Sequence, residues 1–269
     1  MKYLLLTGAA IVALAAAPAT AADMAAKAPY QPPPVAAYDW SGIYVGGHIG
    51  WASQHTTFND PFFIPLGGPS GPPVRSIDAQ GVFGGPQIGW NYQIGHLVVG
   101  NDIDVSFTSL KTDRTDSIVM APAPVAGSDT RTISTKTDWF GTATARLGFA
   151  WDRVLLYSKG GVAAGHFKYG VDDTSVLGIF TSASSFRGSD TRIGWTVGAG
   201  VEWAVWSNLS AKIEYDYLSF ANKPVALDPV VAFAGAGQLV VNVEHSIQTV
   251  KAGLNWRFGP TAAPVAARY

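Results

Sequence analysis

The sequence lacks cysteine and has few charged residues. No cysteine occurs among the 269 residues, which excludes disulfides, a lipid-attached N-terminal cysteine and thiolate chemistry. Charged residues make up 14% of the chain and the formal net charge is −1. No basic stripe is therefore present to neutralise phosphates, and nucleic acid is not expected as a partner. Beyond the first 22 residues, glycine and polar residues interrupt every apolar stretch, so no transmembrane helix is predicted.

The N-terminus reads as an export signal covering residues 1–22. Lys2 supplies a positive charge, and the run over residues 3–16 is almost entirely apolar. Small residues then offer a cleavage position after Ala21 or Ala22. The apolar run is too short to span a bilayer as a helix, so we expect it to be removed on export.

Composition divides the rest of the chain into three parts. Residues 23–39 are rich in alanine and contain Pro32-Pro33-Pro34, which favours an extended periplasmic linker that cannot join a sheet. Residues 40–258 are the predicted barrel, and residues 259–269 form a C-terminal extension.

Eight segments of the predicted barrel alternate apolar and other residues with the period of a β-strand. In the third, Leu97, Val99 and Ile103 oppose Asp102 and Asp104. The segments are centred on residues 43–51, 82–92, 97–107, 139–151, 154–164, 192–203, 209–217 and 249–258.

Two of these segments contain a residue that needs separate explanation. In the fifth, apolar residues occupy both faces, and we place Lys159 inward because a charge facing lipid costs about 2–4 kcal/mol at mid-bilayer. In the second, Pro86 lacks an N–H for the sheet ladder, which predicts a β-bulge.

Short and long connections alternate strictly between the segments. The short ones are residues 95–96, 152–153 and 206–208; the long ones are roughly 54–78, 109–136, 168–190 and 221–242. Membrane barrels sort their connections in this way, with short turns on the periplasmic side and long loops outside. The sequence therefore predicts an all-β fold: an eight-stranded antiparallel transmembrane β-barrel with short periplasmic turns and long extracellular loops.

Charged residues gather on the inward face of the predicted strands. An eight-stranded barrel is only wide enough for side chains to fill it. We therefore expect a buried network of ion pairs that plugs the lumen, since unpaired charges there are costly, although membrane-embedded charges also mark ion pathways. The predicted network comprises Asp102, Asp104, Arg146, Lys159, Arg192, Glu202, Lys212, Glu214, Asp216, Lys251 and Arg257. Beside the short turns, Trp151, Trp203, Trp256 and Phe258 are expected to form an aromatic girdle at the membrane interface.

No catalytic, cofactor or metal site is predicted. The five histidines are scattered and share no metal-ligand spacing, and no nucleophile turn is recognisable. The expected role is structural, with a small-solute porin as the alternative.

A second alternative is a surface receptor or adhesin that binds a host ligand through its loops, because two of them are unusually apolar. The apolar loop residues are Phe58, Phe62, Phe63, Ile64 and Leu66 in the first loop, and Val230, Val231 and Phe233 in the fourth. We favour the simpler interpretation that these loops fold over one another or continue the strands beyond the membrane.

Several stretches resemble the alphaproteobacterial outer-membrane immunogenic proteins, a rhizobium-type porin family. Similar stretches are residues 40–47 (WSGIYVGG), 139–142 with 146–148, 159–163 (KGGVA), 212–215 (KIEY) and 250–258 (VKAGLNWRF). The resemblance spans nearly the whole mature chain. It implies an OmpA-like eight-stranded barrel in the Gram-negative cell outer membrane, a surface antigen with roles in envelope integrity and host contact. The implied partners are outer-membrane lipid and lipopolysaccharide, the barrel-assembly machinery during insertion, and host surface molecules.

The C-terminus departs from this family pattern. The family usually ends at a terminal aromatic that the assembly machinery recognises, whereas here residues 259–268 follow Phe258 and the chain closes on Tyr269. Either Phe258 or Tyr269 serves as that aromatic, and the sequence leaves both open.

Overall fold

The computed structural model describes residues 38–59, 74–120, 127–231 and 238–258, all within one compact unit, Ala36–Pro264. The predicted signal, most of the linker and the C-terminal extension lie outside the described residues. Nine strands are present in the described part: β1 Gly42–Asn59, β2 Val74–Ile94, β3 Leu97–Thr108, β4 Lys111–Met120, β5 Gly127–Trp151, β6 Val154–Leu177, β7 Phe180–Ala204, β8 Leu209–Val231 and β9 Leu239–Phe258. Within the described ranges, the structure contains no helix of the length and apolarity needed to cross a membrane.

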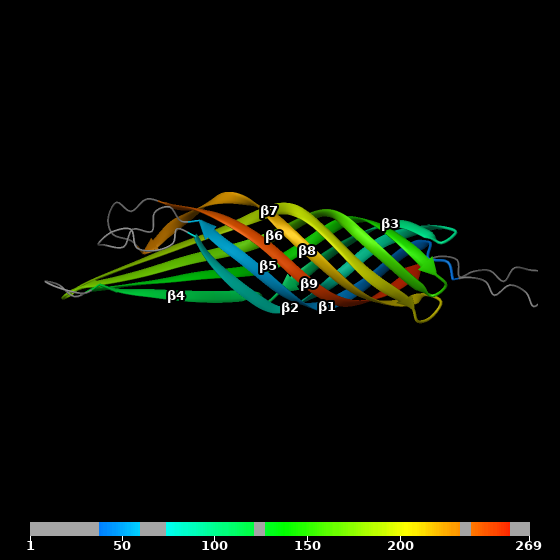
Figure 1. Ribbon diagram of the computed structural model, residues 1–269, viewed down its shortest axis with the longest axis horizontal. Helices are drawn as coiled ribbons and strands as arrows, with labels where there is room; N and C mark the ends of the chain where they lie inside the picture. The colour runs from blue at the N-terminus through cyan, green and yellow to red at the C-terminus, as the bar shows by residue number, and fades with distance from the viewer. Residues whose placement is uncertain (1–37, 60–73, 121–126, 232–237, 259–269) are drawn as a thin grey trace, which may run out of the picture. The chain divides into compact units, whose positions relative to one another are not determined.

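The strands form one antiparallel sheet that closes on itself (Figure 1). β1 pairs with β9 from Ile43↔Phe258 to Asn59↔Asn242, so the first and last strands are neighbours. β3 pairs with β2 on one side and with β5 on the other, which completes a ring of eight strands. The predicted all-β barrel architecture is therefore confirmed.

The ninth strand results from a break in the third. After β3 the chain is irregular at Ser109 and Leu110, and β4 then pairs with the far part of β5, Lys111↔Lys136 to Met120↔Gly127. Leu110 is fully buried, and its carbonyl accepts a hydrogen bond from the Thr137 N–H at 3.0 Å. The expected count of eight differs from the nine strands observed because this apolar side chain turns inward and interrupts β3.

The predicted long loops are largely β-structure. The strands reach 25 residues, and β6 and β7 continue to a tight turn at Gly178-Ile179 where a long loop over residues 168–190 was expected. In Figure 1, β4 to β7 reach beyond the other strands at the left-hand end. The expectation of a loop was wrong here. The interpretation given for the first and fourth loops, that they continue the strands, agrees with the lengths of β1 and β8.

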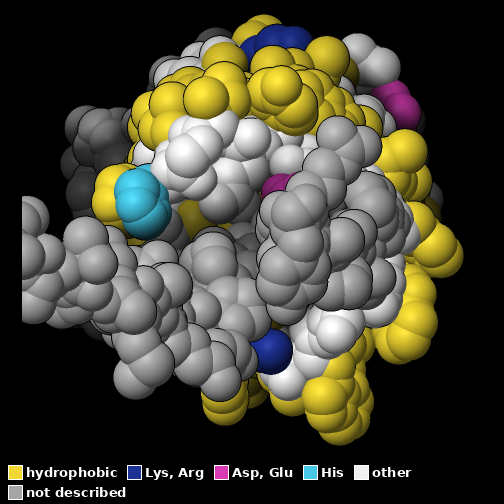
Figure 2. All heavy atoms as spheres, turned by 90° about the vertical axis from the view of Figure 1, so that its right-hand side faces the viewer, with side chains coloured by type: hydrophobic (Ala, Val, Ile, Leu, Met, Phe, Trp, Pro, Cys, Tyr) yellow, Lys and Arg dark blue, Asp and Glu magenta, His cyan; other side chains and the backbone are white. Residues whose placement is uncertain are grey.

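Strands that run through both ends of the barrel, such as β9, reverse the polarity of their two faces along their length. On β9, Val250, Leu254 and Phe258 are exposed, whereas further along Val243 and Ile247 are buried. Apolar side chains thus cover the outside near the short turns, and the inside beyond that level. We call the first region the lipid-facing belt: residues 43–51, 82–94, 97–107, 139–151, 154–164, 193–203, 209–217 and 250–258. We call the second region the extension: residues 52–59, 74–81, 111–120, 127–137, 167–177, 180–191, 218–231 and 239–248. Figure 2, which views the barrel from the short-turn end, shows hydrophobic side chains gathered around its rim.

The three short turns lie at the same end, as predicted. Gly95 has a φ of +61° and Asp152 a φ of +49°, which the tight two-residue connections require. The predicted bulge at Pro86 was wrong. Pro86 lies opposite Gly47, and the β2–β3 register is the same before and after it, Gly84↔Phe107 and Gln87↔Asp104. The β2–β3 pairing is interrupted at residues 85 and 86 and resumes in the same register. The N–H group that proline lacks therefore has no ladder hydrogen bond to make.

The belt predicts a position-dependent cost for charge on the outer face. Ile213→Lys places an ammonium group on an exposed apolar position in the middle of the β8 belt segment, and should destabilise the protein by about 2–4 kcal/mol in lipid. Asn242→Lys, exposed in the extension of β9, should change the stability by less than about 0.5 kcal/mol. Urea unfolding in phospholipid vesicles measures both, and equal effects of the two variants would contradict the position of the belt.

Candidate functional site: the charged lumen

The interior of the barrel is filled in three layers. At the short-turn end lies a lower apolar layer: Trp40, Val98, Ala150, Leu155, Tyr157 and Ala204. The middle layer is polar and charged. At the far end of the belt and within the extension lies an upper apolar layer, which includes Phe58, Phe83, Phe140, Phe167, Phe220, Leu218 and Ile247. The charged groups are thus enclosed by apolar side chains on both sides.

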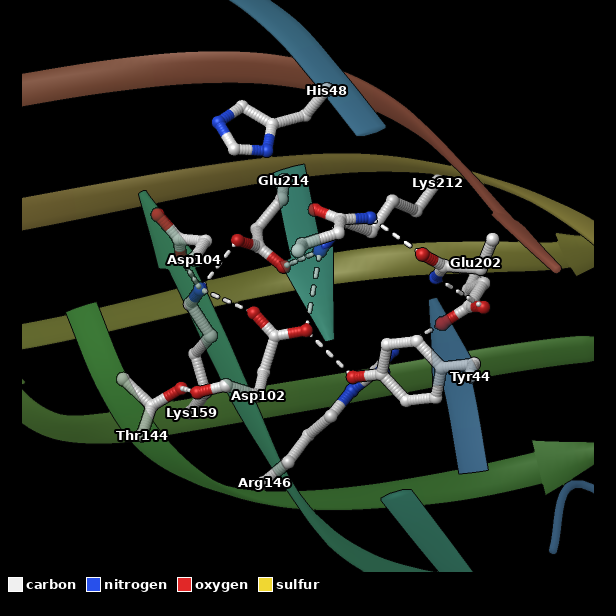
Figure 3. A network of polar contacts seen from close by, with 12 residues as sticks. Tyr44, His48, Asp102, Asp104, Thr144, Arg146, Lys159, Glu202, Lys212 and Glu214 are labelled. Atoms are coloured by element: carbon white, nitrogen blue, oxygen red, sulfur yellow. Dashed lines mark hydrogen bonds and ion pairs between the residues drawn. The ribbon is translucent and has the colours of Figure 1, made fainter. Parts of the chain in front are cut away.

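Lys159 is surrounded by carboxylates (Figure 3). Its Nζ lies 2.6 Å from Glu214 Oε1, 3.4 Å from Asp216 Oδ1, and 3.7 Å from Asp102 Oδ1 and Asp104 Oδ2. The Lys159 side chain has no exposed surface. These partners come from β3 and β8 while Lys159 belongs to β6, so the ion pairs cross the lumen.

Two more lysines complete this cluster. Lys251 Nζ lies 2.8 Å from Glu214, 3.0 Å from Asp216 and 3.2 Å from Asp104. Lys212 Nζ lies 3.3 Å from Glu214 and 3.7 Å from Asp102. Since each lysine shares carboxylates with the others, removal of one partner affects the whole set.

Arg146 and Glu202 form a second pair nearer the short turns. Both side chains are 1% exposed. Glu202 also accepts a hydrogen bond from Asn255 at 3.0 Å, and the Arg146 guanidinium lies 3.5 Å from the centre of the Tyr157 ring. These additional contacts satisfy a charged pair that has lost its water.

Tyrosines connect the two groups, although the sequence analysis did not single them out. The Tyr44 hydroxyl donates to Asp102 at 2.6 Å and accepts from Arg146 at 3.2 Å, and the Tyr157 hydroxyl donates to Glu214 at 2.6 Å. Their signal in the sequence was the strand period, which places both on the inward face together with Lys159. Nearby, His48 Nε2 is 2.8 Å from Ser106 Oγ.

Arg192 lies outside the network that it was predicted to join. It is fully buried at the boundary between the belt and the extension, where the β7–β8 ladder is interrupted between Arg187 and Gly194. Its guanidinium donates to the carbonyl oxygens of Ala221, Lys223 and Val243, and its Nε lies 3.2 Å from Asp190. Arg192 therefore satisfies carbonyl groups at the interruption.

Arg257 also lies apart from the network, at the short-turn end. Its guanidinium donates to the Asp39 carbonyl at 2.9 Å and lies 4.7 Å from the centre of the Trp40 ring. The Trp40 indole in turn donates to the Asp152 carbonyl at 3.1 Å. Arg257 was placed in the network because it faces inward, but it is the last inward residue of its strand and meets the segment that enters β1.

The four residues of the expected girdle are exposed beside the short turns. Trp151, Trp203, Trp256 and Phe258 are all at least half exposed, and they belong to β5, β7 and β9 near the turn ends of those strands. Of the apolar residues predicted to lie in loops, Phe58 is instead buried in the upper apolar layer and Val230 is exposed on β8. The others are either outside the described residues or have side chains that are not described.

His245 is buried in the upper apolar layer. Its ring stacks on Phe167 with centroids 4.4 Å apart, and its two nitrogens lie 2.9 Å from Thr56 Oγ1 and 2.6 Å from the Tyr169 hydroxyl. Burial, assisted by the charge of Arg192, holds the pKa of His245 well below its ordinary value of 6.5. The imidazole is therefore neutral at pH 7. Among the described residues, no group of His, Cys, Asp and Glu could hold a metal ion.

The family model of the outer membrane protein beta-barrel domain matches residues 7–258. The chain belongs to this family. The 31 kDa outer-membrane immunogenic protein of Brucella melitensis is 32% identical over 264 residues, covering 96% of this chain and all of that protein. The 22 kDa outer membrane protein of Rhizobium leguminosarum is 28% identical, covering 76% of this chain and 74% of its own length. Among solved structures, the attachment invasion locus protein Ail of Yersinia pestis matches 80% of this chain and 99% of its own, with 13% identity and a TM-score of 0.33.

The predicted family and location are therefore confirmed: the protein is an outer-membrane β-barrel protein of a Gram-negative bacterium.

Removal of Lys159 tests the network. Lys159→Met leaves Glu214 and its neighbours with an uncompensated buried charge, and should destabilise the barrel by about 3–5 kcal/mol. Lys168→Met, on the same strand but half exposed and paired with Asp138, should cost at most about 1 kcal/mol. The temperature at which each variant loses its folded, faster-migrating gel band measures the difference, and similar temperatures would contradict the network.

The neutral His245 predicts a loss of stability in acid. The unfolded chain takes up a proton at His245 below about pH 6.5 while the folded chain does not, so stability falls as the pH drops through this value. Between pH 7.5 and pH 5 the wild type should lose about 2 kcal/mol more than His245→Gln, which has no proton to gain. Urea unfolding at the two pH values gives this difference, and equal losses would show that the imidazole is not kept neutral.

Proposed function

We propose that this protein is a structural outer-membrane barrel with a closed lumen, which contributes to envelope integrity and contacts the surroundings of the cell through its extension. The observation that supports this best is the pairing of the lumen charges. The side chains of Lys159, Lys212, Lys251, Glu214 and Asp216 are at most 2% exposed, and they pair with one another and with Asp102 and Asp104.

A conducting path would have to pass three barriers in series. The lower layer has Leu155 fully buried, and the upper layer has Phe83 and Phe140 in contact with ring centroids 5.2 Å apart. Between them, an ion would have to separate charge pairs that no longer have water to replace their partners. This arrangement favours a closed barrel over the small-solute channel.

The same pairing argues against catalysis in the lumen. A general acid or base needs access to a substrate, whereas the carboxylates and lysines here are enclosed between two apolar layers. We therefore assign these groups to holding the strands together.

We also propose how the chain reaches the membrane. Residues 1–22 would direct export, residues 23–39 would lie in the periplasm, and the barrel-assembly machinery would insert residues 40–258. The exposed girdle residues Trp151, Trp203 and Trp256 would lie at the lipid interface.

Electrical recording separates the two candidate functions. Refolded protein, first shown to migrate as a heat-modifiable band, should give no sustained single-channel openings in a planar bilayer at about 100 mV, because all three layers block the lumen. Stepwise, lasting openings of the folded protein would overturn the closed-barrel proposal and favour the channel.

A further inference from the structure

The hairpin between β6 and β7 ends in an exposed apolar tip. Its turn is Gly178-Ile179, and Gly178 has a φ of +60°, a conformation that glycine adopts without strain. Ile179 is 93% exposed and Phe180 is 74% exposed, which are the largest values for apolar side chains among the described residues outside the lipid-facing belt. Ile179 and Phe180, which we call the hairpin tip, belong to neither of the two apolar layers inside the barrel.

The tip lies far from the membrane that holds the barrel. β7 begins at Phe180 and enters the belt at Ile193. At roughly 3.3 Å per residue, these two residues are about 40 Å apart. Figure 1 shows β6 and β7 meeting at the left-hand extreme of the strands. The apolar side chains of the tip are thus presented away from the cell's own bilayer.

Polarity changes in steps along the end of this sheet. The outermost register row joins Gly127, Leu177 and Phe180, and the next joins Ser128, Val176 and Thr181. Neither row contains a charged residue. The third row contains the first charged residue, Asp129, which accepts a hydrogen bond from Ser175 at 2.9 Å. Further down, Arg131 and Asp173 form an ion pair at 2.5 Å.

We propose that the hairpin tip inserts into the surface of an apposed phospholipid bilayer. The order of the rows corresponds to the layers of such a surface: Ile179 and Phe180 in the acyl region, the hydroxyl groups of Ser128, Thr181 and Ser182 at the headgroups, and the Arg131–Asp173 pair in water. This inference builds on the proposed surface-contact role and gives it a lipid partner.

A lipid surface fits this tip better than a protein site does. The tip is a narrow projection at a two-residue turn, and its apolar side chains are adjacent in the chain. It can therefore enter a fluid bilayer without a matching cavity. The absence of charge in the two outermost rows means that insertion leaves no ion without water.

Environment-sensitive fluorescence tests the insertion directly. Because the chain has no cysteine, Ile179→Cys gives a single site for an NBD label in the full chain, held in a phosphatidylcholine nanodisc. Added phosphatidylcholine vesicles should shift the NBD emission to shorter wavelength and increase it at least about twofold, since the dye moves from water into lipid. The matched control is Ser189→Cys on the same strand, exposed and roughly 30 Å from Phe180, whose emission should not change.

A binding measurement complements the label. The double variant Ile179→Ser with Phe180→Ser should lower co-flotation with these vesicles at least about tenfold, because it removes two large apolar side chains from the contact. Both residues lie outside the core, so the variant should keep the heat-modifiable band of the wild type. Unchanged emission at position 179, or equal flotation of the two proteins, would overturn the proposal. Binding only to vesicles that carry proteins would overturn it too, and would indicate a protein partner. None of these outcomes bears on the proposal of a closed lumen, because conductance measurements test that proposal separately.

Discussion

The closure of the sheet is the constraint on which the rest of this protein depends. Hydrocarbon offers no hydrogen-bond partner to backbone N–H and C=O groups, so a sheet that crosses it cannot have a free edge. Here β1 pairs with β9 and β3 with β5, and the ring closes at eight strands. A ring of this size leaves an interior that side chains fill, which forces the inward residues to satisfy one another. Closure of the sheet therefore requires Lys159 to pair with a group such as Glu214, and this pair in turn helps to hold the closed sheet together.

The reversal of polarity along the strands follows from the change of solvent. Within the belt, lipid surrounds the barrel and the polar side chains lie inside. In the extension, water surrounds the same strands, and apolar residues such as Phe167 and Ile247 form the core. Arg192 shows how the extension accommodates irregularity: its guanidinium occupies the place where β7 and β8 separate. The strands thus continue past the membrane around an ordinary hydrophobic core.

The sequence was most informative where one physical cost dominated. The cost of charge in lipid correctly predicted that the Lys159 side chain points into the lumen. The strand period, together with the alternation of short and long connections, predicted the barrel. The sequence was less informative where tertiary context decides. Leu110 turns inward and divides a strand, and Pro86 fits without a bulge because the ladder beside it is interrupted. The extension was predicted as loops because its sequence is rich in Pro, Gly, Ser and Asp, residues that are common in loops. Arg192 and Arg257 were assigned to the charged network only because they face inward. Their positions along the barrel axis instead determine which groups they contact.

The central claim is that the charges of the lumen are paired in a closed barrel without a continuous path of water. A high-resolution crystal structure of the purified protein tests it most directly. The account predicts Lys159 Nζ within ion-pair distance of Glu214, and no unbroken file of ordered water from Leu155 to Phe83. A continuous water column past these residues, with the lysines and carboxylates separated on its walls, would contradict it.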